Sequence, residues 1–148
     1  MDYPKLNYPP IHLRARRGAC GRTEVFDKVR GRWLVLTPEE WVRRHVVEYL
    51  RSECGFQPEQ IAEEYPVGIN NMAQRADIVA FDCCSRPYLL VECKEPNIKI
   101  DGEVLAQAVR YNSILGCRYI VITNGIATYC YSFEDGNYQP LDHFPHLL

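Results

Sequence analysis

The stretch Ala76–Lys94, ADIVAFDCCSRPYLLVECK, is the part of the sequence that decides the fold. Two apolar runs rich in β-forming residues, Asp77–Phe81 and Tyr88–Cys93, flank residues 82–87, DCCSRP, whose composition is typical of a turn. This pattern predicts a β-hairpin. We expect the other elements of the chain to be arranged around it.

The predicted hairpin brings charged side chains together. With the turn centred near residues 84 and 85, simple antiparallel pairing places Asp77 opposite Glu92, with Cβ atoms about 4.5 to 5.5 Å apart. Because strand side chains alternate with a period of two, Glu92 and Lys94 point to one face and Cys93 points to the other. Two carboxylates and an amine are therefore expected to converge.

These three side chains suit a hard divalent cation beside a phosphodiester. Mg²⁺ usually takes one or two protein carboxylates and keeps other positions for water and phosphate, so Asp77 and Glu92 are candidate ligands. The backbone carbonyl of Cys93 is a further candidate ligand. A bound metal makes water more acidic and neutralises phosphate charge, and the Lys94 ammonium can orient that water. An ordinary charged surface hairpin fits the same residues, because Asp and Glu-x-Lys also occur together by chance.

Asp77, followed fifteen positions later by Glu92-Cys93-Lys94, resembles the signature of the PD-(D/E)xK nucleases, with Ala76 at the place of the loosely kept proline. Further along, Gln107-Ala-Val-Arg-Tyr111 is similar to the Q-x-x-x-Y element of the RecB-like branch. Both motifs occur in the N-terminal nuclease domain of type I restriction enzyme R subunits. The resemblance covers roughly residues 37 to 134.

The resemblance implies a fold, an activity and roles for these residues. The fold is α/β, a restriction-endonuclease-like mixed β-sheet flanked by helices. The activity is hydrolysis of DNA that depends on Mg²⁺, with Mn²⁺ as a substitute. Asp77, Glu92 and Lys94 are then catalytic, and Gln107 and Tyr111 hold the bound strand or orient Lys94. Without the neighbouring motif, Gln107 and Tyr111 are ordinary residues of a helix surface.

The R subunits that the chain resembles also carry a translocating ATPase. This sequence contains no G-x-x-x-x-G-K-[ST] motif, so ATPase or translocase subunits and specificity subunits are expected partners, together with DNA. An alternative is a catalytically silent subunit that keeps the nuclease fold and serves as a nucleic-acid-binding module or scaffold. The sequence distinguishes neither DNA from RNA nor endonuclease from exonuclease action, and it leaves the oligomeric state open.

A helix is predicted to begin at Thr37, which offers an N-cap, with Pro38 at the first helical position and Glu40 completing a capping box. In the nucleases that the chain resembles, an acid on the first helix often completes the metal site, so Glu40 is the candidate, with Glu48 and Glu64 behind it. Capping and the helix dipole explain Glu40 equally well.

Charge is unevenly distributed along the chain. The net charge is −2, but residues 1–36 carry eight basic and three acidic groups, which is +5, and the remainder carries −7. We therefore divide the chain into a basic N-terminal arm with a short hairpin, 1–36, and a nuclease-like domain, 37–148. Candidate DNA-backbone contacts are Arg14, Arg16, Arg17 and, beside the Asp77 strand, Arg75. A solvated arm and a local Arg75–carboxylate pair are the alternatives.

Composition and periodicity bound the remaining possibilities. With 148 residues and 47% hydrophobic content, the chain is expected to form one soluble domain. It shows no membrane-length apolar run and no leader pattern, so we expect a cytoplasmic protein. Seven cysteines lack zinc spacing and are expected to be reduced, which disfavours a redox or zinc protein. Further elements are predicted as follows: a strand at 61–67, a polar connection at 68–74, a helix from Asp101 or Gly102 to 115, and strands at 118–123 and 126–133.

Overall fold

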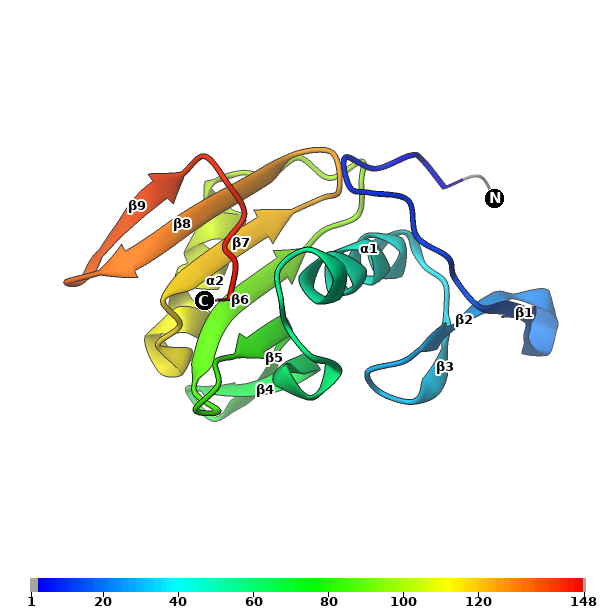
Figure 1. The fold of residues 1–148 in the computed structure, drawn as a ribbon, viewed down its shortest axis with the longest axis horizontal. Coiled ribbons are helices and arrows are strands. Elements are labelled where there is room, and N and C mark those ends of the chain that lie inside the picture. Colours follow the sequence, from blue (N-terminus) through cyan, green and yellow to red (C-terminus); the bar gives the residue numbers. More distant parts are fainter. Residues whose placement is uncertain (1–2, 148) are drawn as a thin grey trace.

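The computed structural model describes residues 3–147 as two β-sheets and two α-helices (Figure 1). The larger sheet has six strands in the order β4-β5-β6-β7-β8-β9, and only β6 and β7 are parallel within it. Its strands are β4 (Ile61–Ile69), β5 (Met72–Phe81), β6 (Pro87–Cys93), β7 (Tyr119–Thr123), β8 (Thr128–Glu134) and β9 (Asn137–Leu141). The predicted mixed sheet flanked by helices is confirmed.

Both α-helices begin at the residues that their caps predict, and α2 also ends where it is expected to end. α1 (Pro38–Ser52) starts after Thr37, whose Oγ1 accepts the Glu40 N–H at 3.1 Å. α2 (Gly102–Leu115) starts after Asp101, whose carboxylate accepts two backbone N–H groups of the first turn. It ends at Gly116, which has a φ of +70°, a conformation that costs glycine little.

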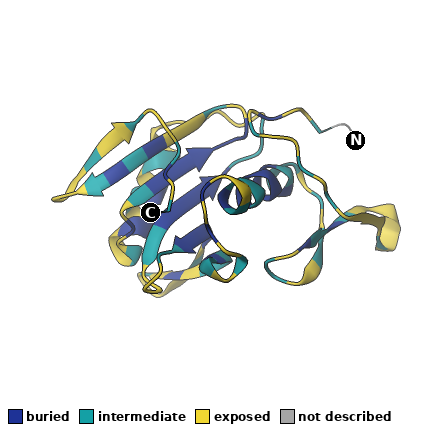
Figure 2. Cartoon of the chain, viewed as in Figure 1, coloured by how far each residue is buried: buried dark blue, intermediate teal, exposed yellow. Residues whose placement is uncertain are grey.

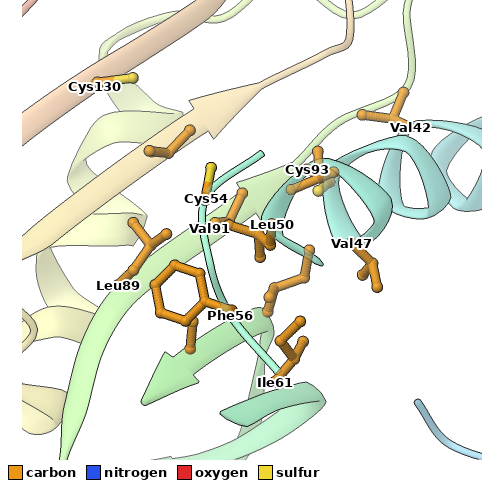
Figure 3. Close-up of a cluster of buried hydrophobic side chains, with 14 of the residues drawn as sticks. Val42, Val47, Leu50, Cys54, Phe56, Ile61, Leu89, Val91, Cys93 and Cys130 are labelled. Carbon is orange, nitrogen blue, oxygen red and sulfur yellow. The ribbon is translucent and has the colours of Figure 1, made fainter. Parts of the chain in front are cut away.

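The two helices cover opposite faces of the large sheet, and each face has its own apolar core. On the α1 side, Val42 and Leu50 of α1 and Leu89 and Val91 of β6 belong to one cluster of buried apolar side chains, which Figure 3 shows. On the α2 side, Ala108 and Tyr111 pack with strand residues of the alternate parity, among them Leu90, Ile120 and Ile122. Burying one such aliphatic side chain contributes roughly 1.5–3 kcal/mol. The central strands are therefore buried on both faces, as the dark strands of Figure 2 show.

The predicted hairpin is present as β5 and β6. Ile78 pairs with Val91 and Val79 with Leu90, which is the expected register. The register shifts by one residue near Phe81, next to the turn. Because β6 also pairs in parallel with β7, the strand end that carries Glu92 lies in the interior of the sheet and not at its edge.

The N-terminal segment forms a separate three-stranded antiparallel sheet of β1 (Ala15–Arg17), β2 (Thr23–Asp27) and β3 (Arg32–Val35). β2 and β3 correspond to the hairpin expected in this region. Residues 3–14 form no helix or strand, but they are held against the body of the domain. Leu6 is buried, and the Trp41 indole donates to the Pro4 carbonyl at 2.8 Å.

The polar connection predicted at 68–74 is wrong for most of its length. β4 continues to Ile69 and β5 begins at Met72, joined by Asn70 and Asn71. Both asparagines have a positive φ, which is the geometry of a tight hairpin turn. β9 and β1 were not predicted from the sequence. No helix within residues 3–147 is long and apolar enough to cross a membrane.

Candidate active site

Asp77, in the middle of β5, and Glu92, near the end of β6, lie side by side where the pairing between the two strands stops. The ladder between β5 and β6 stops at the Ile78–Val91 pair, and Asp77 and Glu92 are the next residues in step. Beyond that pair, the Cys93 N–H donates to Oδ2 of the Asp77 side chain at 2.7 Å, and not to a backbone carbonyl of β5. The Asp77 carboxylate is thereby fixed against β6.

The pairing between β4 and β5 is interrupted beside Asp77. β4 and β5 pair at Glu63–Ile78 and again at Tyr65–Ala76, but the residues between them, Glu64 and Asp77, do not pair. Glu64 has a φ of +53°, which costs a residue with a side chain of this kind about 1–3 kcal/mol. The kink changes the face to which β4 points, since Glu63 contacts α1 and Tyr65 packs on the α2 side.

The electrostatics of the pair are unfavourable without a cation. Glu92 is buried, and burial together with the negative charge of Asp77 raises the pKa of its carboxyl to about 10. Oε1 of Glu92 is buried and finds no hydrogen-bond partner within residues 3–147. An unpartnered buried oxygen of this kind is costly. A divalent cation held by Asp77 and Glu92 would remove both costs, so the residues fit a metal site.

Lys94 lies beside this pair. It lines a hollow of about 870 Å³ together with Glu39 and Gln107, and its positive charge acts to lower the pKa of Glu92. Its backbone N–H donates to the Thr123 carbonyl of β7 at 2.9 Å. Because the peptide between Cys93 and Lys94 is trans, the Cys93 carbonyl points the other way, toward β5 and Asp77. The Lys94 side chain and the Cys93 carbonyl therefore both lie near Asp77 and Glu92. We call this part of the structure, around Asp77, Glu92 and Lys94, the carboxylate corner.

Gln107 and Tyr111 of α2 face the carboxylate corner from the other side. The Gln107 amide donates to the Tyr111 hydroxyl at 3.2 Å, and that hydroxyl donates to Oε1 of Gln74 on β5 at 3.0 Å. Burial raises the pKa of Tyr111, and the charges of Glu92 and Asp77 act in the same direction. The phenol is thus held neutral near the carboxylates, and Gln74 is a partner that the sequence did not suggest.

Arg43 is a further residue of the site that sequence reasoning missed. Its Nη2 donates to Oδ1 of Asp77 at 3.1 Å, and its Nη1 lies 2.8 Å from Oε1 of Glu40. Burial by itself lowers the pKa of the guanidinium, but the surrounding carboxylates outweigh burial and raise it. The spacing of Glu39 and Arg43, one helical turn apart, was the available signal.

The glutamate of α1 that lies beside the pair is Glu39. Both oxygens of Glu40 are held by arginines, at 2.8 Å by Arg43 and at 3.0 Å by Arg44. Burial and the negative charge of Asp77 raise the pKa of Glu39, while Lys94 acts to lower it. Of the two reserve candidates, Glu64 lies 2.9 Å from Arg43, whereas Glu48 pairs with Arg51. The structure therefore places Glu40 between two arginines and Glu39 near Asp77 and Lys94, and the role of either acid in holding a metal stays a prediction.

The arginines that were predicted to contact DNA lie outside the carboxylate corner. Arg75 is exposed, and its guanidinium donates to the Glu64 carbonyl at 3.2 Å. Arg14, Arg16 and Arg17 lie on β1 and the residue before it, in the small N-terminal sheet. Their role in binding DNA stays a prediction.

Other candidate chemistry finds little support in the described residues. Within residues 3–147, no three His, Cys, Asp or Glu side chains gather closely enough to hold a metal ion by themselves. The divalent-cation hypothesis thus depends on two carboxylates and a backbone carbonyl. All seven cysteines are free, and four of them are buried. His45 uses Nδ1 for the Trp41 carbonyl at 2.8 Å.

Comparisons with known proteins agree with this fold. Residues 38–145 match the family described as "Type I restriction enzyme R protein N terminus". Among solved structures, the chain is similar to a fragment assigned as an HsdR subunit of a type I restriction enzyme from Vibrio vulnificus YJ016, with a TM-score of 0.58 and 26% identity. The match covers 75% of this chain but only 24% of that one. No curated protein matches the chain significantly.

Proposed function

Because the chain belongs to the family of the type I restriction enzyme R protein N terminus, we propose that it hydrolyses DNA phosphodiesters with the help of a divalent cation. Mg²⁺ is the proposed cofactor, and Mn²⁺ is expected to replace it. The chain would act as a restriction-type nuclease domain that has no ATPase motor in the sequence given.

The observation that carries this proposal is the buried pair of carboxylates. Asp77 and Glu92 adjoin where the pairing of β5 with β6 stops, and one oxygen of Glu92 has no hydrogen-bond partner among the described residues. A structural ion pair would have an arginine or lysine in contact with each acid. Two adjoining acids with an unused oxygen are instead suited to a divalent cation.

Each side chain at the carboxylate pair would have its own role in the reaction. Asp77 and Glu92 would hold the cation, with the Cys93 carbonyl as a further ligand. When bound, the cation supplies a more acidic water and neutralises phosphate charge. The Lys94 ammonium is suited to orient the attacking water and to stabilise the negative charge that develops on the phosphate. Gln107 and Tyr111, linked to each other, position the strand or Lys94 from α2.

The proposed function also implies partners. The HsdR fragment that the chain resembles is part of a type I restriction enzyme, and this chain spans about a quarter of it. Translocation and sequence recognition would then come from ATPase and specificity subunits or domains. DNA is the proposed substrate.

Cleavage of supercoiled and linear DNA in Mg²⁺ or Mn²⁺ tests the proposal. The variants Asp77→Ala and Lys94→Ala are expected to lose activity by about 10²–10³-fold or more, since each removes charge stabilisation at the reacting phosphate. Lys99→Ala is the matched control, because Lys99 is an exposed lysine of the same hollow.

Three outcomes would be decisive. Equal cutting by wild type, Asp77→Ala and Lys94→Ala would point to a contaminating nuclease and refute the proposal. Metal-dependent cutting by wild type and Lys99→Ala, but not by Asp77→Ala or Lys94→Ala, would support the proposal. No cutting by any protein, with DNA binding intact, would support the silent-subunit alternative.

A further inference from the structure

The small sheet of β1, β2 and β3 lies outside the residues that match the family, which begin at residue 38. We call residues 14–35 the basic wing. Figure 1 shows it beside α1, extending away from the six-stranded sheet, and Figure 2 shows that β1 and the turn after it are exposed. The family match therefore gives this part of the chain no role.

Ion pairs hold the wing in a fixed position on the body of the domain. Asp27 at the end of β2 is fully buried and lies 2.9 Å from Nη1 of Arg44 on α1. Arg30, in the β2–β3 turn, lies 3.4 Å from Glu63 on β4. Val25 is also fully buried. Whatever binds to the exposed side of the wing is thus held in a defined position relative to α1 and β4.

One face of the wing carries arginines laid over aromatic rings. The guanidinium of Arg14 lies 5.1 Å from the ring centres of both Phe26 and Trp33, and that of Arg16 lies 4.2 Å from the Trp33 ring. Arg16 also pairs with Glu24 at 2.7 Å. Arg14 and Arg16 are exposed. Stacking fixes the planes of these guanidiniums, so less conformational freedom is lost when their N–H edges bind an acceptor.

The wing is the strongly basic part of the protein. Residues 14–35 hold seven basic and two acidic side chains. Both acids are already paired, Glu24 with Arg16 and Asp27 with Arg30 and Arg44. Four basic residues of the wing form no ion pair within residues 3–147, and these are Arg17, Arg22, Lys28 and Arg32. An excess of unpaired positive charge remains available to an anionic partner.

The wing and the candidate active site share one surface. A hollow of about 660 Å³ is lined by Arg32 of the wing, by Glu39 of α1 and by Arg75 of β5. Glu39 also lines the hollow of about 870 Å³ that contains Lys94. Arg32 points to the face of the wing opposite the stacked arginines, because Asp27 pairs with Arg32 and Phe26 with Trp33. A duplex that contacts both sets would therefore lie across the β3 edge of the wing and extend past Glu39 toward Lys94.

We propose that the basic wing binds the phosphate backbone of double-stranded DNA and aligns the duplex with the carboxylate pair. Single-strand binders offer free aromatic faces on which bases stack. Here Arg14 and Arg16 lie over the Phe26 and Trp33 rings, so guanidinium N–H groups are presented to phosphates instead. This inference rests on the proposed function for the direction of the DNA, but the binding itself is independent of cleavage.

Binding of a short fluorescent DNA duplex in EDTA, measured by anisotropy across a salt series, tests the proposal. Arg17→Gln/Arg32→Gln is expected to bind about tenfold more weakly and to flatten the slope of log affinity against log salt by about 2, since each lost phosphate contact removes roughly 0.9. Arg86→Gln/Arg118→Gln is the matched control. It removes two exposed arginines that line a separate hollow beside the β5–β6 turn, and its binding is expected to match wild type.

A second variant tests the stacked arginines. Arg14→Lys/Arg16→Lys keeps both charges but loses the planar guanidiniums, so the affinity is expected to fall while the salt slope stays unchanged. Equal weakening by the wing and control pairs of substitutions would overturn the proposal, as would tighter binding of single strands than of duplex. Because EDTA prevents metal-dependent cleavage, an inactive protein that binds through the wing would refute only the proposed function. An active protein whose DNA binding ignores the wing would refute only this inference.

Discussion

Two buried clusters of charge lie on either side of consecutive residues of α1. Arg44 points into an ionic cluster that we define as Asp27, Arg30, Glu40, Arg44 and Glu63. Arg43 points toward the carboxylate pair of Asp77 and Glu92. The clusters share a helix and a bridging acid, since Glu40 contacts both arginines.

The clusters differ in how their acids are compensated. In the ionic cluster, Arg30 and Arg44 both contact Asp27 and Glu63. Burial raises the pKa of Asp27, but the hydrogen bond to Glu63 and the charge of Arg44 outweigh it and leave the value at about 2. Burial raises the pKa of Glu63 to about 7 against the effect of Arg44. Each acid of the ionic cluster is thus contacted by two arginines, which is the pattern of a structural cluster, although Oε2 of Glu63 is buried and has no hydrogen-bond partner among the described residues.

The carboxylate pair has less compensation. Of the two acids of the pair, only Asp77 forms an ion pair with Arg43, and Oε1 of Glu92 has no hydrogen-bond partner in the described part of the chain. A carboxyl pKa of about 10 means that Glu92 binds a proton at neutral pH when no metal is present. Buried acids alone therefore do not indicate a metal site. A shortage of cations beside them is the distinguishing feature.

The largest expected effect is on stability and concerns the ionic cluster. Arg44→Met removes the more deeply buried of the two arginines that Asp27 and Glu63 share, so the free energy of unfolding should fall by about 3–5 kcal/mol in urea denaturation. Glu92→Gln should not lower it in EDTA, because the Glu92 carboxyl is already neutral in the folded protein and glutamine needs no protonation to fold. Similar losses for both variants would remove the distinction between the clusters.

The two glutamates of the first turn of α1 separate the roles further. Glu39→Gln is expected to lower metal-dependent cleavage by about tenfold, because Glu39 lies beside Asp77 and Lys94. Glu40→Gln is expected to lower the free energy of unfolding by about 1–3 kcal/mol, because it weakens bonds to Arg43 and Arg44. The reverse assignment, with Glu40→Gln impairing metal binding in a stable protein, would restore Glu40 as the metal-site acid.

The pH dependence of stability should report Glu92. Its carboxyl pKa is raised from an ordinary 4.5 to about 10, so the stability present below about pH 4.5 is lost progressively as the pH rises toward 10. Glutamine does not titrate. The Glu92→Gln variant should therefore gain stability relative to wild type between about pH 6 and pH 9 in EDTA. Parallel urea titrations of the two proteins measure the difference, and parallel curves would contradict it.

The smallest expected effect concerns the phenol of α2. Tyr111→Phe removes the hydroxyl that joins Gln107 to Gln74, which should lower the free energy of unfolding by about 1 kcal/mol. If Tyr111 also positions the strand or Lys94, cleavage should fall by a larger factor than stability explains. Unchanged cleavage at full folding would limit Tyr111 to a structural role.

The sequence was most informative where one pattern determines the geometry. The turn at 82–87 determines the register of β5 and β6, and a period of two then places Glu92 beside Asp77. The caps Thr37 and Asp101 determine where the helices begin. The sequence was less informative where strands are exposed. Residues 68–74 have the polar composition of a loop. In the structure, however, most of them pair with one another across the hairpin and lengthen β4 and β5.

The sequence could not assign the acid of α1 or its arginine. Glu39 and Glu40 are adjacent, and which carboxylate turns to Asp77 depends on where Arg43 and Arg44 lie after packing. The positive φ of Glu64 gives no sequence signal either, because glutamate rarely adopts it. Both features follow from tertiary contacts of the wing and β4 with α1. Local patterns do not carry that information.

Calorimetric titration with Mn²⁺ tests the central claim, that Asp77 and Glu92 form a site for a divalent cation. Wild type is expected to show one saturable site and to release about one proton per ion, seen as a buffer-dependent enthalpy, because Glu92 must lose its proton. Binding should disappear in Asp77→Asn and remain in Glu63→Gln, which removes a buried acid from the ionic cluster. Equal Mn²⁺ binding by wild type and Asp77→Asn, with no proton release, would contradict the account.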